Sequence, residues 1–395
     1  MSKQATVRSS DWVVRNTELS HASVLTIPPP AQPGDAASDV DTPSLVLDLD
    51  VFEDNLRTLQ AFAERYGVGV RPHAKAHKCP QVALRQIALG AVGICCQKVS
   101  EAVPFVAAGV RDVLISNEVV GSAKLAMLAQ LALRAHVTVC VDHPQALRAL
   151  SAAMAEQAAT VSVLVEVDVG QKRCGVQTPE EVVDLARQIQ ALPHVVFRGI
   201  QTYHGGLQHK RDATSRAQAC EKVALRIRKV KAALAHSGFD CPVVSGAGTG
   251  TVAFDIPSGV FTEIQAGTYA FMDSDYAAND WGDTLGFRHA LCILGTVMST
   301  PVAGRAVVDV GLKSVSAESG LPLLLDYPGA RVTGISDEHC VLQADDPAAL
   351  PSLGAVVRLV PAHCDPTFNL HDQLVCVRQN SVEAVWPVAA RGLSR

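Results

Sequence analysis

The segment Arg71–Lys78 reads RPHAKAHK and follows an apolar run, so it crowds basic and imidazole side chains into one short stretch. One interpretation is a solvated basic turn, where most charge clusters of this kind lie. The other is a reactive lysine, Lys75, because neighbouring positive groups and a dry wall can lower a lysine pKa and make its amine nucleophilic. The cluster alone leaves both interpretations open.

A second cluster, His363-Cys364-Asp365-Pro366, lies late in the chain. If this stretch is extended, alternate residues share a face, so His363 and Asp365 converge and Cys364 points away. A histidine nitrogen and a carboxylate oxygen can share one divalent cation, and this donor pair favours Mn²⁺, Mg²⁺ or Co²⁺ over ions that seek thiolates. The alternative is a satisfied histidine beside a turn aspartate.

The stretch Ser245–Gly250 reads SGAGTG and could surround an anion. Its glycines at 246, 248 and 250 allow positive φ and close backbone approach, so successive N–H groups can converge on a phosphate, with the hydroxyl of Thr249 beside them. The loop fits neither the dinucleotide fingerprint nor the P-loop. Its alternative is a plain flexible turn.

The elements that must position these residues follow an α/β pattern. We expect a first strand at Ser44–Leu49, then a helix that Asp50 caps and Gly67 ends. Eight further strands, most of them separated by helices, are expected at Val68–Arg71, Ala91–Cys95, Asp112–Ser116, His136–Val141, Val161–Val167, Val196–Thr202, Pro242–Ser245 and Phe261–Gln265. Eight parallel strands favour a closed (β/α)8 barrel over an open doubly wound sheet.

The pattern changes at residue 286, after which short strand-like runs are joined by Gly, Pro and Asp turns with no convincing helix. We therefore divide the chain into an N-terminal arm (residues 1–40), a barrel (residues 41–285) and a smaller all-β domain (residues 286–395). The first strand, residues 44–49, pairs either with the barrel or with the β domain. The arm is polar and its end is rich in proline.

Composition indicates a cytoplasmic protein that acts on a small molecule. Apolar residues make up 48% of the 395-residue chain, and the net charge of -5 is spread without a basic face for nucleic acid. The 11 cysteines show no regular spacing, which argues against a disulfide framework or a zinc finger and favours reduced thiols. We also expect no membrane span and no signal peptide.

In a (β/α)8 barrel the working residues lie at the carboxyl ends of the strands, and phosphate sites favour the loops after the last two strands. The polar residues that follow the expected strands are His73, Lys75, Gln97, Arg173, Tyr203, His204, Ser245, Gly248, Thr249, Gly250, Gly267, Thr268 and Tyr269. A crowded lysine opposite a phosphate loop suggests pyridoxal 5'-phosphate, which needs an amine, an anion site and partners for its ring. Lys75 is then the amine, and Arg173 pairs with the ring oxygen unless it serves a structural ion pair.

Several stretches agree on one resemblance: Pro72–Lys78, Cys95–Ala102, Ser245–Gly250, Gln265–Asp273 and His363–Thr367. Together they resemble the D-threonine aldolase and 3-hydroxy-D-aspartate aldolase family, fold-type III pyridoxal phosphate enzymes related to alanine racemase and D-serine dehydratase. The match runs from about residue 40 to the end of the chain. Dehydratases of this group typically carry His-x-Cys at the metal site, whereas this chain carries His-x-Asp, which points to the aldolase side.

The resemblance implies a Schiff base at Lys75 and a phosphate site formed by the glycine loop, Gly267 and Thr268 with help from Tyr203. It implies a metal site at His363 and Asp365. It also implies a homodimer in which the β domain of one subunit faces the barrel mouth of the other.

The expected reaction is metal-dependent retro-aldol cleavage of a D-3-hydroxy-amino acid, of the D-threonine or 3-hydroxy-D-aspartate type, to glycine and an aldehyde. The metal orients the 3-hydroxyl and lowers its pKa, and a metal-bound water, His73 or His204 removes its proton. Dehydration of D-serine or 3-hydroxyaspartate is the alternative, with Lys75 as the base. Two further alternatives are a non-catalytic pyridoxal phosphate-binding protein, which would not need the β domain, and an aldolase whose lysine attacks a carbonyl substrate directly.

Overall fold

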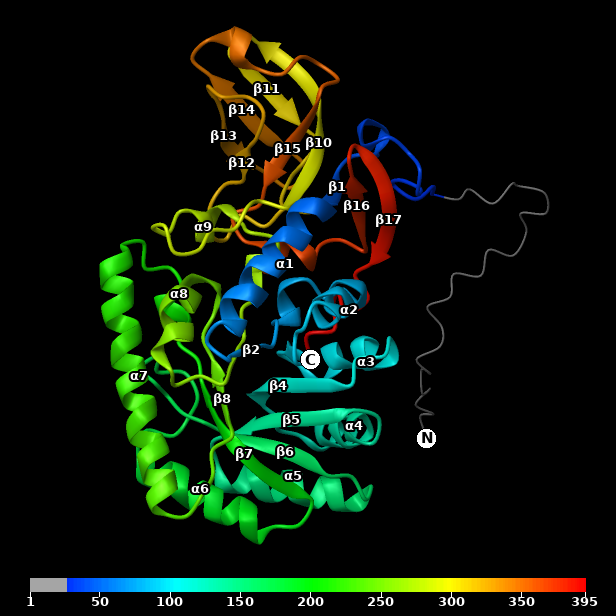
Figure 1. Ribbon diagram of the computed structural model, residues 1–395. Helices are drawn as coiled ribbons and strands as arrows, with labels where there is room; N and C mark the ends of the chain where they lie inside the picture. The colour runs from blue at the N-terminus through cyan, green and yellow to red at the C-terminus, as the bar shows by residue number, and fades with distance from the viewer. Residues whose placement is uncertain (1–26) are drawn as a thin grey trace, which may run out of the picture.

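The computed structural model describes residues 27–395, so most of the expected N-terminal arm lies outside the described residues. A barrel and a β domain make up the described chain, and α1 (Leu49–Glu64) runs between them (Figure 1). The barrel strands are β2 (Gly69–Val70), β3 (Ile94–Cys96), β4 (Asp112–Glu118), β5 (His136–Val141), β6 (Val161–Glu166), β7 (Val195–Thr202), β8 (Val243–Gly246) and β9 (Glu263–Ile264).

The sheet closes on itself, which confirms the barrel and rules out the open sheet. Neighbouring strands pair in parallel throughout, in the order β2-β9-β8-β7-β6-β5-β4-β3. Between β2 and β3, Cys95 N donates to Pro72 O at 2.8 Å, and His73 forms a parallel bridge with Cys95. Parallel strands inside a barrel are covered on both faces. Accordingly, every residue of β6 is buried.

Helices cover the outside of the barrel and alternate with its strands. They are α2 (Pro80–Ala88), α3 (Val99–Ala107), α4 (Ser122–Ala132), α5 (Pro144–Glu156), α6 (Pro179–Ala191), α7 (Ala213–His236) and the short α8 (Val252–Asp255). The N-cap of α1 is Asp48 and not Asp50 as expected, because the preceding strand ends one residue earlier and the Asp48 carboxylate accepts from Val51 N at 3.0 Å. Asp50 instead lies in the first helical turn.

The β domain is a mixed sheet that includes the first strand of the chain. Its strands are β1 (Ser44–Asp48), β10 (Leu291–Val302), β11 (Arg305–Val308), β12 (Leu323–Leu324), β13 (Ala330–Ile335), β14 (Cys340–Ala344), β15 (Val356–Val360), β16 (Gln373–Arg378) and β17 (Ser381–Pro387). β1 pairs antiparallel with β10 and parallel with β16, so the chain starts in the β domain before it enters the barrel. The expectation of no helix after residue 286 is wrong for α10 (Cys364–Phe368).

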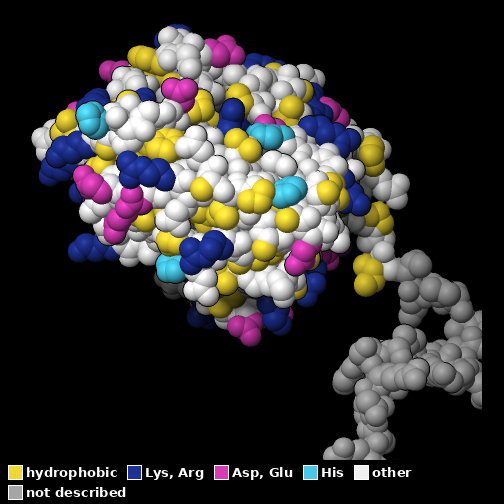
Figure 2. All heavy atoms as spheres, turned by 90° about the horizontal axis from the view of Figure 1, so that it is seen from below, with side chains coloured by type: hydrophobic (Ala, Val, Ile, Leu, Met, Phe, Trp, Pro, Cys, Tyr) yellow, Lys and Arg dark blue, Asp and Glu magenta, His cyan; other side chains and the backbone are white. Residues whose placement is uncertain are grey.

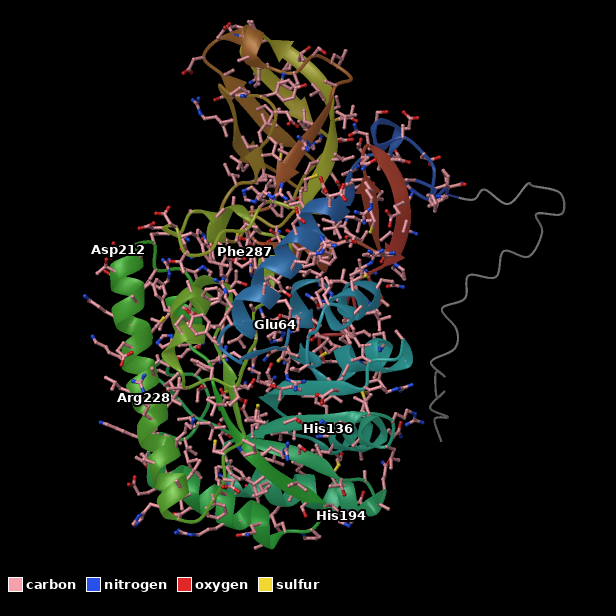
Figure 3. The ribbon with its side chains drawn as sticks, viewed as in Figure 1. Glu64, His136, His194, Asp212, Arg228 and Phe287 are labelled. Atoms are coloured by element: carbon pink, nitrogen blue, oxygen red, sulfur yellow. The ribbon has the colours of Figure 1, made fainter. Side chains whose placement is uncertain are left out.

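The barrel strands run toward the β domain. His194, just before β7, lies at the end of the barrel farthest from the β domain, whereas Asp212, beyond β7, lies near α9 (Ser274–Ala277) at the other end (Figure 3). Seen from that far end, basic and acidic side chains are interspersed (Figure 2). Among residues 27–395, no helix combines the length and the apolar character needed to cross a membrane.

Candidate active site

Lys75 stands at the mouth of the barrel, in the 3₁₀ turn Ala74–Ala76 that follows β2. Its side chain is 40% exposed, and its amine is hydrogen-bonded to the carboxylate of Asp365 in α10. Burial by itself lowers the pKa of Lys75, but the negative charge of Asp365 outweighs it and raises that pKa above its ordinary value. The expectation that neighbouring positive charges lower the pKa of Lys75 is therefore wrong in this structure, because the nearest charge is negative.

Other basic groups of the cluster face different partners. Lys78 is buried, and its amine lies 3.2 Å from Glu101 Oε1, 2.9 Å from Asn369 Oδ1 and 2.8 Å from Ser394 Oγ. Arg71 points into the barrel. Of the two lysines, Lys75 is therefore the one whose amine faces the barrel mouth.

His73 positions the lysine turn. Its Nδ1 accepts from Lys75 N at 3.4 Å, and its Nε2 lies 3.1 Å from Ser116 Oγ. Burial, reinforced by the charge of Lys75, lowers the pKa of His73 to about 3. Because both ring nitrogens are engaged and the ring stays neutral, His73 is a poor candidate for the base that takes a substrate proton.

The ring of His204 has a buried Nδ1 that finds no hydrogen-bond partner among the described residues. A Cβ built at Gly170 would lie 3.5 Å from its Nε2, so the ring packs against the loop after β6. Burial lowers the pKa of His204. Its neighbour Tyr203 is the residue of the two that faces the site, because the charges of Lys75 and Asp365 both act on its hydroxyl, whose pKa is raised by burial.

The glycine loop after β8 needs glycine because Gln208 lies against it, with its side chain at Gly248 and its backbone at Gly250. A Cβ at Gly248 would meet Gln208 Oε1 at 2.6 Å, and a Cβ at Gly250 would meet Gln208 O at 2.2 Å. Positive φ is not the reason, contrary to expectation, since Gly248 has φ -157° and the positive φ of 60° falls on Ala247. Gly250 N donates to Gln208 Oε1 at 2.9 Å, so Gln208 holds the shape of a loop whose glycines let an anion such as phosphate approach the backbone.

The loop after β9 lies against the lysine turn. A Cβ at Gly267 would lie 3.0 Å from the Cβ of Ala76, and the thiol of Cys364 lies 3.8 Å from Thr268 Oγ1. The loops after β8 and β9 are tied together by Tyr269 N, which donates to Thr249 Oγ1 at 3.0 Å. The Tyr269 hydroxyl is buried beside Gln86 of α2, so its side chain does not face the site.

The remaining predicted cofactor residues line the barrel interior and its rim. The guanidinium of Arg173 lies 5.6 Å from the ring centre of Tyr203, within reach of the same space as Lys75. Gln97 Nε2 is 3.5 Å from Ser116 O, and Ser245 Oγ donates to Glu263 at 2.7 Å. An amine, an anion cradle and polar ring partners therefore surround one opening, which fits pyridoxal phosphate.

His363 and Asp365 converge, although the stretch is not extended. His363 is the N-cap of α10 and Asp365 lies in its first turn, with His363 Nε2 3.9 Å from Asp365 Oδ2. His363 Nδ1 lies 3.1 Å from the carboxylate of Asp273, which is fully buried. Because a carboxylate only accepts, Nδ1 carries the proton and Nε2 is left free to bind a metal.

Cys364 does not point away from the pair, as an extended strand would require. Its Sγ lies 3.6 Å from Asp365 Oδ1 and close to the His363–Asp273 contact. Burial raises the pKa of this thiol well above its ordinary value, and the side chains of His363 and Asp365 supply a nitrogen and an oxygen donor beside it. The donor set therefore fits an oxygen-preferring divalent ion.

The sequence interpretation missed a second histidine and carboxylate pair, which lies near His363. His209 Nδ1 lies 2.5 Å from Asp275 Oδ2, and the ring of His209 is 5.1 Å from the ring of Tyr276. Tyr276 in turn stacks on His363 with ring centres 6.5 Å apart. The His209 side chain is about half exposed, so its Nε2 is available to take a proton.

Comparisons with known proteins agree with this geometry. Residues 47–275 match the family model "Alanine racemase, N-terminal domain" and residues 290–377 match "Putative serine dehydratase domain". The chain is 56% identical over 371 residues to a D-threonine aldolase of Arthrobacter sp, covering 94% of this chain and 98% of that protein. It is 43% identical over 370 residues to the 3-hydroxy-D-aspartate aldolase of Paracoccus denitrificans, covering 92% and 95%. The crystal structure of D-threonine aldolase from Filomicrobium marinum superposes with a TM-score of 0.91 at 49% identity, covering 93% of this chain and all of that one.

Proposed function

The chain belongs to the D-threonine aldolase and 3-hydroxy-D-aspartate aldolase family of fold-type III pyridoxal phosphate enzymes, and we propose that it cleaves D-3-hydroxy-amino acids to glycine and an aldehyde. The observation that carries the proposal is the direct contact between Lys75 and Asp365. It joins the amine expected to hold the cofactor to the carboxylate expected to hold a metal. In the reaction proposed here, the cofactor and the metal act at the two carbons of the bond that breaks.

Pyridoxal phosphate, when bound, supplies an electron sink for the bond that breaks. Lys75 would hold it covalently, and the loops at Gly248–Gly250 and Gly267–Thr268 would bind its phosphate. Arg173 would pair with its ring oxygen. Tyr203 closes the space beside the lysine.

A divalent ion, when bound, would hold the substrate's 3-hydroxyl and lower its pKa. His363 would bind it through Nε2 and Asp365 through a carboxylate oxygen, with Asp273 fixing the histidine ring. His209, oriented by Asp275, is the base that the geometry favours for the hydroxyl proton. We prefer it to His73, whose two ring nitrogens are both engaged, and to His204, whose Nδ1 is buried.

We further propose that the protein acts as a homodimer in a reducing compartment such as the cytoplasm. All 11 cysteines are free thiols, as a reducing environment favours. Sedimentation velocity measures the mass in solution, and a monomer at catalytic concentrations would contradict the dimer.

The test of function is to offer D-threonine, D-3-hydroxyaspartate and D-serine with Mn²⁺ or with a chelator, and to identify the products. We expect glycine and an aldehyde from the first two substrates, only with metal. A 2-oxo acid with ammonia would indicate dehydration instead. Asp365→Ala should stop cleavage and leave the visible absorbance of the bound cofactor intact. Full cleavage after exhaustive chelation would refute the role of the metal.

A further inference from the structure

Asn279, two residues beyond α9, is a buried polar residue that the proposed mechanism leaves unused. It is 5% exposed, and both ends of its amide are engaged: Nδ2 donates to Gln208 O at 2.8 Å, and Oδ1 accepts from Arg211 Nη1 at 2.8 Å. Gln208 and Arg211 stand on either side of His209, the proposed base. One side chain therefore holds both ends of the turn that carries the base.

The two partners fix the direction of the Asn279 amide. A guanidinium only donates hydrogen bonds and a backbone carbonyl only accepts them. The oxygen of the amide must therefore face Arg211, and its NH₂ group must face Gln208 O. A rotated amide would bring two oxygens together at Gln208 and two donors together at Arg211, and both hydrogen bonds would be lost.

The other contacts of Arg211 close a ring through Asp275. Arg211 Nη2 is paired with Asp275 Oδ1, and His209 Nδ1 lies 2.5 Å from Asp275 Oδ2. Burial by itself raises the pKa of Asp275, but the contacts with Arg211 and His209 outweigh it and lower that pKa below its ordinary value. The carboxylate therefore accepts from both side chains. Because Asn279 links Arg211 to Gln208, the contacts form a closed ring that begins and ends in the turn of the base.

The side chain of Gln208 is committed elsewhere. Its Oε1 accepts from Gly250 N at 2.9 Å, and its Nε2 donates to Thr251 Oγ1 at 3.1 Å. These contacts tie the start of the turn to the loop after β8, and they leave the backbone carbonyl of Gln208 for Asn279. At the other end of the turn, Arg211 O accepts from Asp280 N at 2.9 Å, so the segment after α9 holds the turn there as well.

The segment that carries Asn279 also orients the proposed metal residue. Asp273, the N-cap of α9, contacts His363 Nδ1 at 3.1 Å. The backbone of α9 is anchored next to that histidine, because Ser274 N donates to Pro361 O at 3.1 Å. The place of the base relative to the metal residue is therefore set by one short stretch, residues 273–280.

We propose that Asn279 is a positioning residue that holds His209 where it can take the proton of the substrate's hydroxyl, an inference that rests on the proposed function. A base acts only within hydrogen-bond reach of the proton that it removes. Asn279 acts through the Gln208 carbonyl and Arg211, so its loss frees both ends of the turn while His209 itself stays in the chain.

The experiment is a double-mutant cycle between Asn279→Ala and His209→Ala, in enzyme loaded with pyridoxal phosphate and Mn²⁺. Single-turnover formation of glycine from D-threonine gives the rate at saturation and the half-saturating concentration. Asn279→Ala should lower the saturated rate about 10-fold to 100-fold, the size expected when a reacting group is misplaced by about 1 Å, and should leave the half-saturating concentration unchanged. In the His209→Ala background the same change should lower the rate less than about twofold, because no base is left to position.

Asn55→Ala is the matched control. Asn55 is also buried, and its Nδ2 also donates to backbone carbonyls, those of Ala270 and Arg288. Any loss of rate that it causes should be equal with and without His209, as for independent sites. If Asn279→Ala does not fold, Arg211→Met serves instead, because it opens the same ring at a side chain that is 46% exposed. Its effect should depend on His209 in the same way.

The outcomes separate this inference from the proposed function. A wild type that forms no glycine from D-threonine or from 3-hydroxy-D-aspartate refutes the proposed function itself. Equal losses from Asn279→Ala in both backgrounds, or a His209→Ala variant with the wild-type rate, overturn the role of Asn279 and leave the cleavage reaction standing. An Asn279→Ala variant that keeps the full rate, or that raises only the half-saturating concentration, overturns it as well.

Discussion

Replacing Asp273 tests how the histidine of the proposed metal pair is held. One carboxylate oxygen of Asp273 accepts from His363 Nδ1 and from Cys364 N, each at 3.1 Å, and the other accepts from Tyr276 N at 2.9 Å. Asp273→Asn can keep its oxygen toward His363 and Cys364, but it loses the charge and turns its amide toward the N–H of Tyr276. Asp273→Ala removes all three bonds.

The expected effect follows from what such orienting partners contribute. Loss of a hydrogen-bonded partner behind a metal-binding histidine weakens metal affinity about 10-fold to 100-fold, which corresponds to about 1.4–2.8 kcal/mol. We expect Asp273→Asn near the lower value and Asp273→Ala near the upper one. Titration calorimetry of Mn²⁺ into the chelator-treated holoenzyme measures the affinity, and visible absorbance checks that the cofactor stays bound. Asp345→Asn, on an exposed side chain of the β domain, is the control.

Two results would refute this reasoning. If Asp273→Ala binds Mn²⁺ as tightly as the wild type, His363 does not depend on Asp273 for its orientation. If the variant loses cofactor and metal in parallel, Asp273 supports the fold of the barrel mouth and not the metal residues in particular.

Three further predictions concern the cofactor side of the site and the barrel interior. Lys75→Ala should lose the borohydride-reducible cofactor linkage and lower turnover by orders of magnitude, whereas Lys78→Ala should keep the linkage; the reverse pattern would identify Lys78 as the amine. Gly248→Val should weaken pyridoxal phosphate binding, because its side chain meets Gln208, while circular dichroism shows a folded barrel; unchanged affinity would make the loop a simple turn. Burial, helped by the charge of Glu118, raises the pKa of Glu166 from 4.5 to about 8, so the folded chain binds a proton that the unfolded chain releases above pH 4.5. Wild-type thermal stability should therefore fall as pH rises from 4.5 through 8, and Glu166→Gln should lack this part of the slope; identical pH profiles would show that Glu166 ionises normally.

Much of the fold follows from local patterns in the sequence. Apolar β-branched runs and amphipathic helices are set by residues close together in the chain, and the carboxyl end of each strand is where a barrel places its working residues. From that rule alone, Lys75, the glycine loop and Thr268 are predicted to lie around one opening. Boundaries were less predictable: two aspartates, Asp48 and Asp50, both suit an N-cap, and only the end of β1 decides between them.

Residues that act through distant partners were not predictable. Asp273 and His363 are 90 positions apart, and His209 and Asp275 are 66 apart. No spacing rule connects such pairs. Asp273 did stand inside a stretch that carried the family resemblance, which was the one available signal. His209 had none, because it lies five residues beyond Tyr203-His204, the polar pair that follows β7.

The lysine cluster shows why crowding in sequence is a poor guide to electrostatics. The turn after β2 sends its side chains in different directions: Arg71 into the barrel, Lys78 toward the last residues of the chain, and Lys75 toward α10. The charge that dominates Lys75 comes from Asp365, 290 positions away. His73 stays neutral, because burial destabilises its protonated form more than the charge of Asp365 stabilises it. The cluster therefore marks Lys75 for a reason other than mutual repulsion: this turn is where the barrel mouth meets the helix that carries Asp365.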